Sequence, residues 1–182
     1  DDFTKPVDPY ADSKKRAENE LKKRFVDSNM AVEIVRSALV YGKGMKGNLP
    51  DLIRAVERGL PKPPDVGARN MIWLDDLVSF LILVGREPGN SVRKFVVTDG
   101  EVYSLSRIYD AIRSICGQET VNSWLPLSAW RVMALVNDLF RRLPVGTTFN
   151  KLFSHQVFDS SNLKDWEVTI SFEDAIEKIL SS

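Results

Sequence analysis

Two short, mostly apolar segments separated by helical sequence limit the possible folds most strongly. Segment 30–36 (MAVEIVR) is interrupted only by Glu33, and segment 93–100 (RKFVVTDG) ends in a turn. Runs of this kind are typical of parallel strands that are buried on both faces. The sequence therefore predicts an α/β fold with a βαβ-like pattern. Because two strands do not form a stable doubly wound sheet, we expect the remaining strands to lie outside this chain or to come from a partner.

Helices are predicted around these strands from apolar periodicity and from capping residues. Ser104 is expected to cap one helix, and Ser171 with Asp174 resembles a capping box for the last one. The predicted helices cover 9–29, 49–59, 74–85, 105–117, 127–143 and 171–180, and 68–73 is predicted as a short strand.

Three expectations concern packing. The helix 74–85 is apolar over most of its surface, so we expect it to be covered on both sides. The helix 127–143 is also strongly apolar and could contact a partner or a membrane surface, but an ordinary packed helix is the preferred interpretation, and a membrane is not expected as a partner. The aromatic residues Trp124, Trp130 and Phe140 are expected in the core.

Composition excludes several classes of function. The 182 residues contain 25 basic and 25 acidic side chains, so the net charge is zero and no nucleic-acid partner is expected. The single Cys116 cannot form an internal disulfide, which fits a reducing compartment, and the single His155 excludes a histidine cluster for a metal. The start of the chain does not resemble a signal peptide, and the longest apolar run is too short to span a bilayer. We therefore expect a cytoplasmic protein.

Tyr10 and Lys14 lie four residues apart in the predicted first helix, on a stripe that continues through Ala17, Leu21 and Phe25. Side chains at this spacing are neighbours on a helix. An ammonium beside a phenol favours the phenolate, and lysine has spare donors for a ribose hydroxyl. The pair is therefore suited to moving a proton while a hydride moves elsewhere. The same spacing also arises by chance, and a lysine on an apolar face often extends its charge into solvent.

Four segments in order resemble one known family. The stretch YADSKKRAE resembles the Tyr-x-x-x-Lys helix of the short-chain dehydrogenase/reductase superfamily, and IVRSALVYGKG resembles the Arg-Pro-x-x-Val-Tyr-Gly strand of its extended branch. ARNMIWLDDLVSFLILV and KFVVTDGEVYSLSRIYDAI resemble two further motifs of that branch, and NLKDWEVTISFEDAI resembles its C-terminal ending more weakly. The extended branch is the NAD-dependent epimerase/dehydratase family, which acts on nucleotide sugars.

The resemblance implies roles for residues near the cofactor. Tyr10 would be the general acid/base, and Lys14 would hold the nicotinamide ribose and tune Tyr10. Ser37, Ala38 and Val40 would line the nicotinamide side, largely through their backbone. An ordinary connection from strand to loop explains that last stretch equally well.

The resemblance also implies a substrate pocket. Asn48 and Leu49 match the family's Asn-Leu at the mouth of the nucleotide-sugar site, although Asn48 can equally be a helix cap. Arg69 matches an arginine that reaches the diphosphate, for which a planar fork of donors is suited. The alternative for Arg69 is a surface ion pair, for example with Asp65. Asp76 is interpreted as structural, bracing its helix together with Asp75.

Departures from the family pattern limit these expectations. The Gly-x-x-Gly-x-x-Gly turn that holds the cofactor pyrophosphate does not occur in the sequence. We therefore expect the C-terminal part of a doubly wound Rossmann-type fold plus a mostly helical substrate-binding lobe, and a chain that is inactive alone. Segments 1–42 and 74–100 would belong to the cofactor domain, and 43–73 and 101–182 to the lobe. Ser37 replaces a frequent proline, and Trp73 replaces the usual histidine.

The functional prediction is an NAD- or NADP-dependent nucleotide-sugar epimerase of the 4-epimerase type, acting as a homodimer through the Tyr10–Lys14 helix. Two alternatives stay open within the family: reduction of a nucleotide-4-keto sugar, and dehydration. A non-catalytic protein that binds a nucleotide or sugar on the same scaffold is a third. An interaction module that uses the Tyr10 helix as a dimer surface is a fourth.

Overall fold

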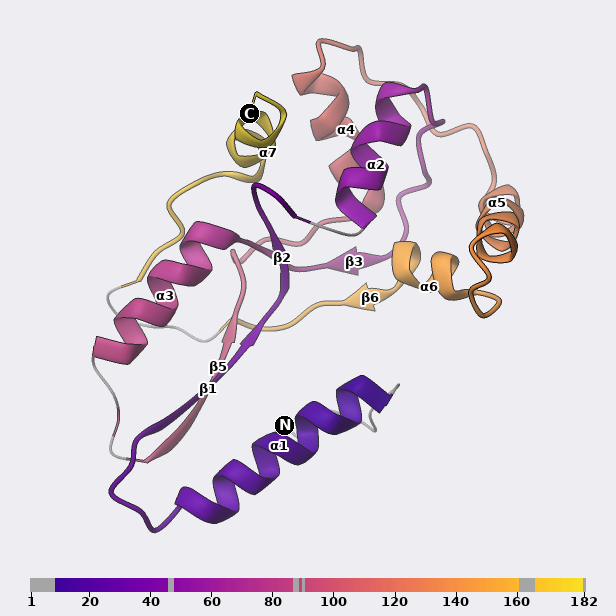
Figure 1. Ribbon diagram of the computed structural model, residues 1–182. Coiled ribbons are helices and arrows are strands. Elements are labelled where there is room, and N and C mark those ends of the chain that lie inside the picture. Colours follow the sequence, from indigo (N-terminus) through magenta and orange to yellow (C-terminus); the bar gives the residue numbers. More distant parts are fainter. Residues whose placement is uncertain (1–8, 46–47, 87–88, 90, 161–165, 182) are drawn as a thin grey trace.

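The structure is a computed structural model, and it describes residues 9–45, 48–86, 89, 91–160 and 166–181. Helices and parallel strand pairs alternate through the first half, and helices predominate in the second half (Figure 1). The elements are α1 (Pro9–Phe25), β1 (Val32–Ser37), β2 (Leu39–Tyr41), α2 (Asn48–Glu57), β3 (Ala68–Arg69), β4 (Met71–Trp73), α3 (Leu74–Arg86), β5 (Val92–Val97), α4 (Leu105–Ile115), α5 (Leu127–Phe140), α6 (Thr147–Phe153), β6 (His155–Gln156) and α7 (Phe172–Leu180).

The predicted parallel strand pair is confirmed. β1 and β5 run side by side in parallel, in a register that pairs Val32 with Val92 and Ser37 with Val97. A parallel pair requires a long crossover, and the segment between β1 and β5 supplies it with α2, α3 and three short strands. The prediction of a mixed α/β fold is therefore confirmed.

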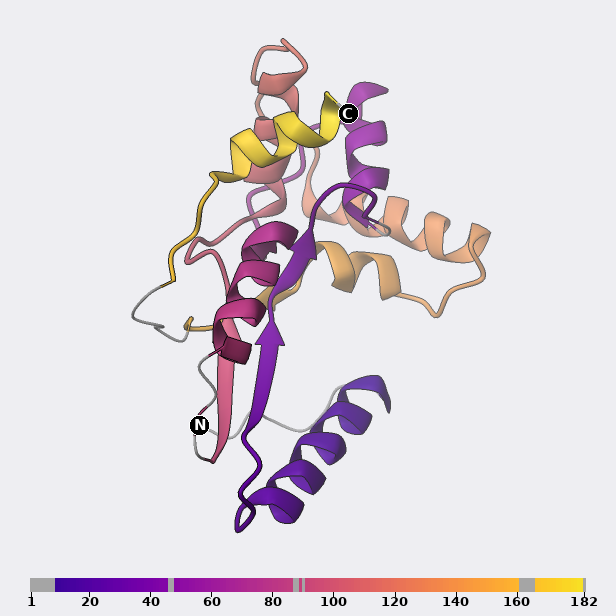
Figure 2. The same ribbon diagram turned by 60° about the vertical axis from the view of Figure 1, so that its left-hand side comes forward.

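The sheet is covered less completely than the apolar strand sequence predicts. α3 and α1 lie on opposite sides of the β1–β5 pair (Figure 1 and Figure 2). In β1 only Ile34 is buried, and among the described residues of α1 none is buried. The expectation of a strand buried on both faces is wrong here, and the stripe that begins at Tyr10 is not a core face. α1 has few contacts with the strands, which explains both differences.

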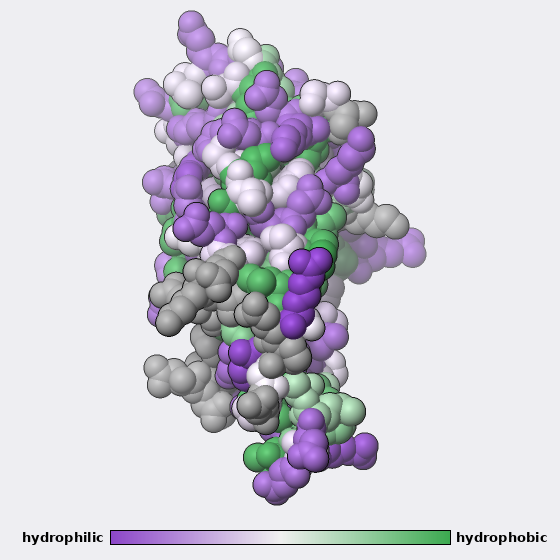
Figure 3. Space-filling view, turned by 90° about the vertical axis from the view of Figure 1, so that its left-hand side faces the viewer, coloured by the Kyte–Doolittle hydropathy of each residue, from purple (hydrophilic) through white to green (hydrophobic). Residues whose placement is uncertain are grey.

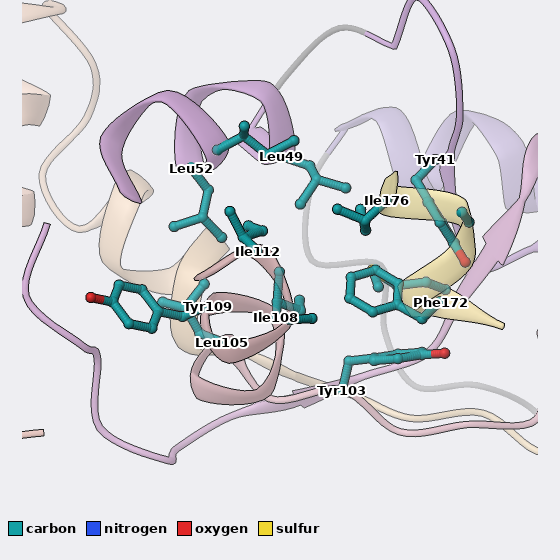
Figure 4. Close-up of a cluster of buried hydrophobic side chains, with 14 of the residues drawn as sticks. Tyr41, Leu49, Leu52, Tyr103, Leu105, Ile108, Tyr109, Ile112, Phe172 and Ile176 are labelled. Atoms are coloured by element: carbon teal, nitrogen blue, oxygen red, sulfur yellow. The ribbon is translucent and has the colours of Figure 1, made fainter. Parts of the chain in front are cut away.

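The main core lies between α2, α4 and α7 (Figure 4). Phe172 at the start of α7 is 1% exposed and packs with its ring against Tyr41 and Tyr103, at centroid distances of 5.4 and 4.8 Å. The predicted caps of two of these helices are confirmed. Ser104 Oγ accepts from Arg107 N at 3.1 Å, and Ser171 Oγ accepts from Asp174 N at 3.1 Å.

A junction at 68–73 pairs with strands from both halves of the chain. The predicted short strand is two strands, because β3 pairs with β6 while β4 pairs with β2. Between them, the buried Asn70 donates from Nδ2 to Glu101 O at 2.6 Å and accepts from Phe158 N at Oδ1, also at 2.6 Å. Arg69 also exchanges backbone hydrogen bonds with Tyr103, at 3.0 and 2.8 Å. Three separate segments, 39–41, 101–103 and 155–158, therefore meet at six consecutive residues.

Asp76 has the structural role predicted for it. It is 1% exposed, and its Oδ1 accepts from Thr169 N at 3.2 Å and from Thr169 Oγ1 at 2.5 Å. These bonds attach α3 to the segment before α7. Asp75 accepts from Trp73 Nε1 at 3.1 Å, so it fixes the indole that replaces the family's histidine.

The predicted covering of α3 on both sides is wrong, because α3 buries Asp76, Phe80 and Val84 but exposes a second apolar stripe. α5 packs on α6 with one side, as an ordinary packed helix does, and exposes the other. Trp130 is in the core as predicted, but Trp124 is 74% exposed and Phe140 is 84% exposed. Hydrophobicity alone does not indicate which side of a helix is covered. The exposed residues of the stripe on α3 are Leu74, Val78, Leu81 and Ile82.

The surface is uneven in polarity. On the face that carries α3 and α7, hydrophilic side chains cover most of the upper part (Figure 3). Among the residues that the structure describes, no helix is long and apolar enough to cross a bilayer.

The burial of Phe172 predicts a large effect on stability. Replacing Phe172 with Ala should lower the free energy of unfolding by about 3–5 kcal/mol, because the truncation leaves a cavity between three packed segments. Phe140→Ala removes the same side chain from an exposed position and should change the free energy of unfolding by less than about 0.5 kcal/mol. Urea unfolding followed by circular dichroism measures both. Equal losses for the two variants would contradict this account of the core.

Candidate functional site

The first candidate site lies between α1 and the end of β1. Tyr10 and Lys14 sit one turn apart on α1, with Lys14 Nζ 5.4 Å from the centroid of the Tyr10 ring. Both line a hollow of about 680 Å³ together with Ser37 and Ala38 at the carboxyl end of β1. Ligands of open α/β sheets bind beyond the carboxyl ends of parallel strands, so the hollow is in the position expected for a ligand site.

The chemical groups in this hollow are accessible. Tyr10 is 70% exposed, and Ser37 is exposed as well. Ala38 is buried, and its N–H donates to Val97 O at 2.9 Å, which continues the pairing of β1 and β5 by one residue. A phenol that reaches solvent beside an ammonium can exchange a proton with a bound molecule.

An ion pair holds α1 against β1 two turns along from Tyr10. Arg36 donates from Nε to Glu18 Oε1 at 2.7 Å and from Nη2 to Glu18 Oε2 at 2.6 Å. These hydrogen bonds lower the pKa of Glu18 below its ordinary value of 4.5. Glu18 lies four residues after Lys14 and lines the same hollow. The fork therefore fixes the face of α1 that carries Tyr10 and Lys14.

A second hollow, of about 380 Å³, contains other predicted residues. Val40, Leu49 and Arg69 line it together with Lys151 and Gln156. The two hollows share no lining residue within the described ranges, so Val40 belongs with Arg69 and not with Tyr10. They are adjacent along the chain, because Ala38 lines one hollow and Leu39 lines the other.

Arg69 is fixed by α6. Its Nη2 donates to Lys151 O at 2.7 Å and to Leu152 O at 2.6 Å. Burial lowers the pKa of Arg69, which still carries its charge near neutral pH. These two acceptors are neutral carbonyls and not the carboxylate of Asp65 that the alternative interpretation names. The positive charge is therefore available to an anion in the hollow.

The other predicted residue at this hollow is only partly described. Asn48 begins α2, as a helix cap or first-turn residue should, but its side chain lies outside what the structure describes. Leu49 is buried in the core cluster. The described part of the chain brings together no group of three His, Cys, Asp or Glu side chains that could hold a metal ion.

The sequence interpretation missed the wall of the second hollow. α6 and β6, which were not predicted, supply Lys151, Leu152 and Gln156 to it. α6 is itself held from α5, because Asp138 Oδ1 accepts from Thr148 N at 2.9 Å and from Thr148 Oγ1 at 2.5 Å. The two phenylalanines of α6 four residues apart, Phe149 and Phe153, are the sequence signal that could have indicated this short helix.

Comparisons with known proteins agree with the predicted resemblance. A curated UDP-glucose 4-epimerase from Vibrio cholerae is 31% identical over 129 residues, which are 69% of this chain and 38% of that protein. The crystal structure of a UDP-glucose 4-epimerase with UDP-glucose from Thermotoga maritima matches 97% of this chain and 53% of that chain, with a TM-score of 0.68 and 18% identity. The Bordetella bronchiseptica enzyme WbmG in complex with NAD matches 100% and 51%, with a TM-score of 0.63 and 20% identity.

These matches confirm the resemblance to NAD-dependent nucleotide-sugar epimerases and the Rossmann-type fold class. The structural likenesses, at 18 and 20% identity, concern the fold alone. No protein-family model matches the chain. The chain spans 38% of the length of the curated relative and about half the length of these solved structures.

The Glu18–Arg36 fork predicts a pH-dependent contribution to stability. Because the pKa of Glu18 is lower in the folded chain than in the unfolded chain, the contribution is complete above the ordinary value of 4.5 and is lost as the pH falls through the folded value. Glu18→Gln should lower the free energy of unfolding by about 1–2 kcal/mol near neutral pH. The difference from the unchanged protein should disappear in acid, as urea unfolding over a pH series would show.

The control for this fork is on the same helix. Asp12 pairs with Arg16 on an exposed side of α1, at 2.7 Å. Asp12→Asn should therefore cost less than about 0.5 kcal/mol at any pH. If Glu18→Gln behaved like Asp12→Asn, the fork would not be what holds α1 in place.

Proposed function

We propose that this chain forms part of an NAD- or NADP-dependent nucleotide-sugar epimerase of the 4-epimerase type, with Tyr10 as general acid/base. The observation that carries the proposal is the hollow in which Tyr10 and Lys14 meet the carboxyl end of β1. The match to a UDP-glucose 4-epimerase supports the choice of reaction. Segments 1–42 and 74–100 would belong to the cofactor domain, and 43–73 and 101–182 to the substrate lobe.

The residues present fit one half of the cofactor. Lys14 offers ammonium donors and Ser37 a hydroxyl at an open hollow, and these groups suit the hydroxyls of a nicotinamide ribose. Ala38 brings a small side chain and backbone to the same hollow, against which a flat ring could lie. The pyrophosphate half has no glycine-rich Gly-x-x-Gly-x-x-Gly turn in this sequence to hold it. The chain therefore supplies the reacting end of the site.

Tyr10 performs the proton transfer in this proposal. Its phenolate oxygen accepts the proton of the sugar hydroxyl whose carbon is oxidised, and the resulting phenol returns that proton when the ketone is reduced on the opposite face. Lys14, beside the ring, stabilises the phenolate that is present before the first transfer and after the second. Glu18 and Arg36 keep Tyr10 in position. The nicotinamide, when bound, supplies the acceptor and donor for the hydride.

Arg69 would bind the diphosphate of the substrate. Its guanidinium faces the second hollow, is held by two carbonyls of α6 and keeps its charge. A planar fork of donors is suited to a diphosphate. Asn48 and Leu49 at the start of α2 would border the same ligand. The structure of the Thermotoga maritima relative with UDP-glucose supports a UDP-sugar as the substrate class.

The alternatives differ in what Tyr10 does. Reduction of a nucleotide-4-keto sugar uses the same proton donor in one direction, and dehydration uses the same oxidation as its first step. A non-catalytic binding protein would use the hollow without proton transfer. The exposed side of α1 also makes it available for a homodimer, which is part of this proposal.

Tyr10→Phe tests the catalytic role directly. In a protein that contains this chain together with its cofactor-binding segment, the substitution should reduce turnover of the UDP-sugar by about 10²–10⁴-fold, because it removes the group that transfers the proton. Binding of the nucleotide sugar, measured by calorimetry, should remain. Unchanged turnover would refute the acid/base role of Tyr10, and a ligand-dependent signal without any turnover would favour the non-catalytic alternative.

Tyr109→Phe is the matched control for the loss of a phenol oxygen. Tyr109 is buried, and its hydroxyl donates to Leu60 O at 2.7 Å, away from the Tyr10 hollow. This variant should be less stable by about 1 kcal/mol but should keep its turnover.

Binding of NAD to the chain alone is a second test. Because the sequence has no Gly-x-x-Gly-x-x-Gly turn for the pyrophosphate, the chain by itself should bind NAD only weakly, with a dissociation constant above about 1 mM. Isothermal titration calorimetry on the 182-residue chain measures this constant. Micromolar binding would show that the chain holds the cofactor by other means than those proposed.

A further inference from the structure

The outer face of α5 is an exposed apolar surface. α5 packs on α6 with Trp130, Ala134 and Asp138, which are four residues apart and buried. Its opposite side exposes large apolar side chains, with Leu139 at 79% and Phe140 at 84%. We call this side the outer face of α5, and it consists of Val132, Leu135, Val136, Leu139 and Phe140.

Further exposed apolar residues lie beyond both ends of the helix. Trp124, three residues before α5, is exposed, and so is Val145 after its end. α5 lies at the right-hand edge of the molecule in two views turned by 60° (Figure 1 and Figure 2). A group of large exposed apolar side chains on one helix face marks an interaction site.

The charge around this face is positive, although the whole chain is neutral. Between Glu119 and Asp159 the sequence has a single acidic residue, Asp138, and that residue is buried. The basic residues of the same stretch are Arg131, Arg141, Arg142 and Lys151, and all four are exposed. Arg141 and Lys151 line a hollow with Trp130 on the side of α5 that packs on α6, so Arg131, which lies four residues before Leu135, and Arg142 are the cations nearest the outer face. Arg141 is partly neutralised by Asp51 of α2, at 3.4 Å. The complementary partner is therefore both apolar and anionic.

Arg142 is placed at a conformational cost. It follows the end of α5 with a φ of 54°, in the left-handed region. Glycine is the residue that this position after a helix favours, because a Cβ is strained there. An arginine at this position gives up local stability, and it adds a positive charge two residues after Phe140, the last residue of α5.

We propose that the outer face of α5 binds the surface of an anionic phospholipid bilayer, with the helix lying in the plane of the interface. An amphipathic helix with aromatic and aliphatic residues on one face and arginines beside them has the composition of such interfacial helices. With 14 residues and a rise of about 1.5 Å per residue, α5 is too short to span about 30 Å of hydrocarbon. Trp124 would lie at the headgroup level.

Two other surfaces or partners fit less well. Pairing of this face with the same face of a second copy would place cations against cations in either helix direction, because Arg131 and Arg142 stand at its two ends. The exposed stripe of α3 is apolar too, but its first turn carries Asp75 and Asp76 and only its last turn carries Arg86. That stripe therefore provides a control surface.

Vesicle flotation tests the proposal. The full chain should float with vesicles of phosphatidylcholine containing about a third phosphatidylglycerol, should bind pure phosphatidylcholine vesicles at least about fivefold more weakly, and should be released by added salt. Leu139→Ser with Phe140→Ser should weaken binding to the anionic vesicles at least about tenfold. Val78→Ser with Ile82→Ser on α3 removes similar apolar area and should leave binding unchanged.

Arg142→Gly separates binding from folding. The substitution relieves the left-handed strain, so the melting temperature should stay the same or rise, while binding to anionic vesicles should fall about fivefold through loss of one charge. Absence of flotation, equal binding to both kinds of vesicle, or unchanged binding of the Leu139/Phe140 variant would overturn the proposal. A dimer in sedimentation that the same double substitution dissolves would also overturn it, because a second copy would then cover the face.

Discussion

The junction at 68–73 is the constraint on which the second half of the molecule depends. These six consecutive residues form β3, Asn70 and β4, and the two strands pair with different segments. Asn70 satisfies both ends of its carboxamide with backbone groups of segments 31 and 88 residues away in sequence. A buried amide that loses one partner costs about 1–3 kcal/mol, so the geometry is strongly specified. Arg69 owes its position in the second hollow to this same crossing.

The functional proposal follows from how the two hollows are built. Proton transfer requires an accessible phenol beside a cation, and α1 provides both on a helix that the Glu18–Arg36 fork joins to β1. Diphosphate binding requires a charged fork in a partly buried place, which the α6 carbonyls orient. The backbone of 37–40 runs from one hollow to the other. A nucleotide sugar that spans both hollows would place its diphosphate at Arg69 and its reacting carbon at Tyr10. Different contacts hold these two side chains in position.

The sequence predicts the longer helices and strands and misses the shortest elements. β1 and β5 lie in mostly apolar segments, and α4 and α7 have serine caps, so these are recognised. β2 and β6 have only three and two residues, and their pairing partners are distant in sequence, so no local pattern indicates them; β3 is predicted only as part of a single strand over 68–73. The spacing of Tyr10 and Lys14 is visible in one turn of helix. The Glu18–Arg36 fork and the grouping of Val40 with Arg69 depend on tertiary packing, so the sequence alone does not indicate them.

The contacts of α6 have a mechanical consequence. α6 touches α5 through the Asp138–Thr148 hydrogen bonds and the Trp130–Phe153 ring contact at 6.0 Å, and its last turn holds the guanidinium of Arg69. One short helix, α6, therefore separates α5 from the guanidinium of Arg69, which is proposed to bind the diphosphate. A displacement of α5 must either break the hydrogen bonds between Asp138 and Thr148 or move the α6 carbonyls that accept from the guanidinium of Arg69. The position of the Arg69 guanidinium is therefore coupled to the position of α5, and α6 transmits this coupling.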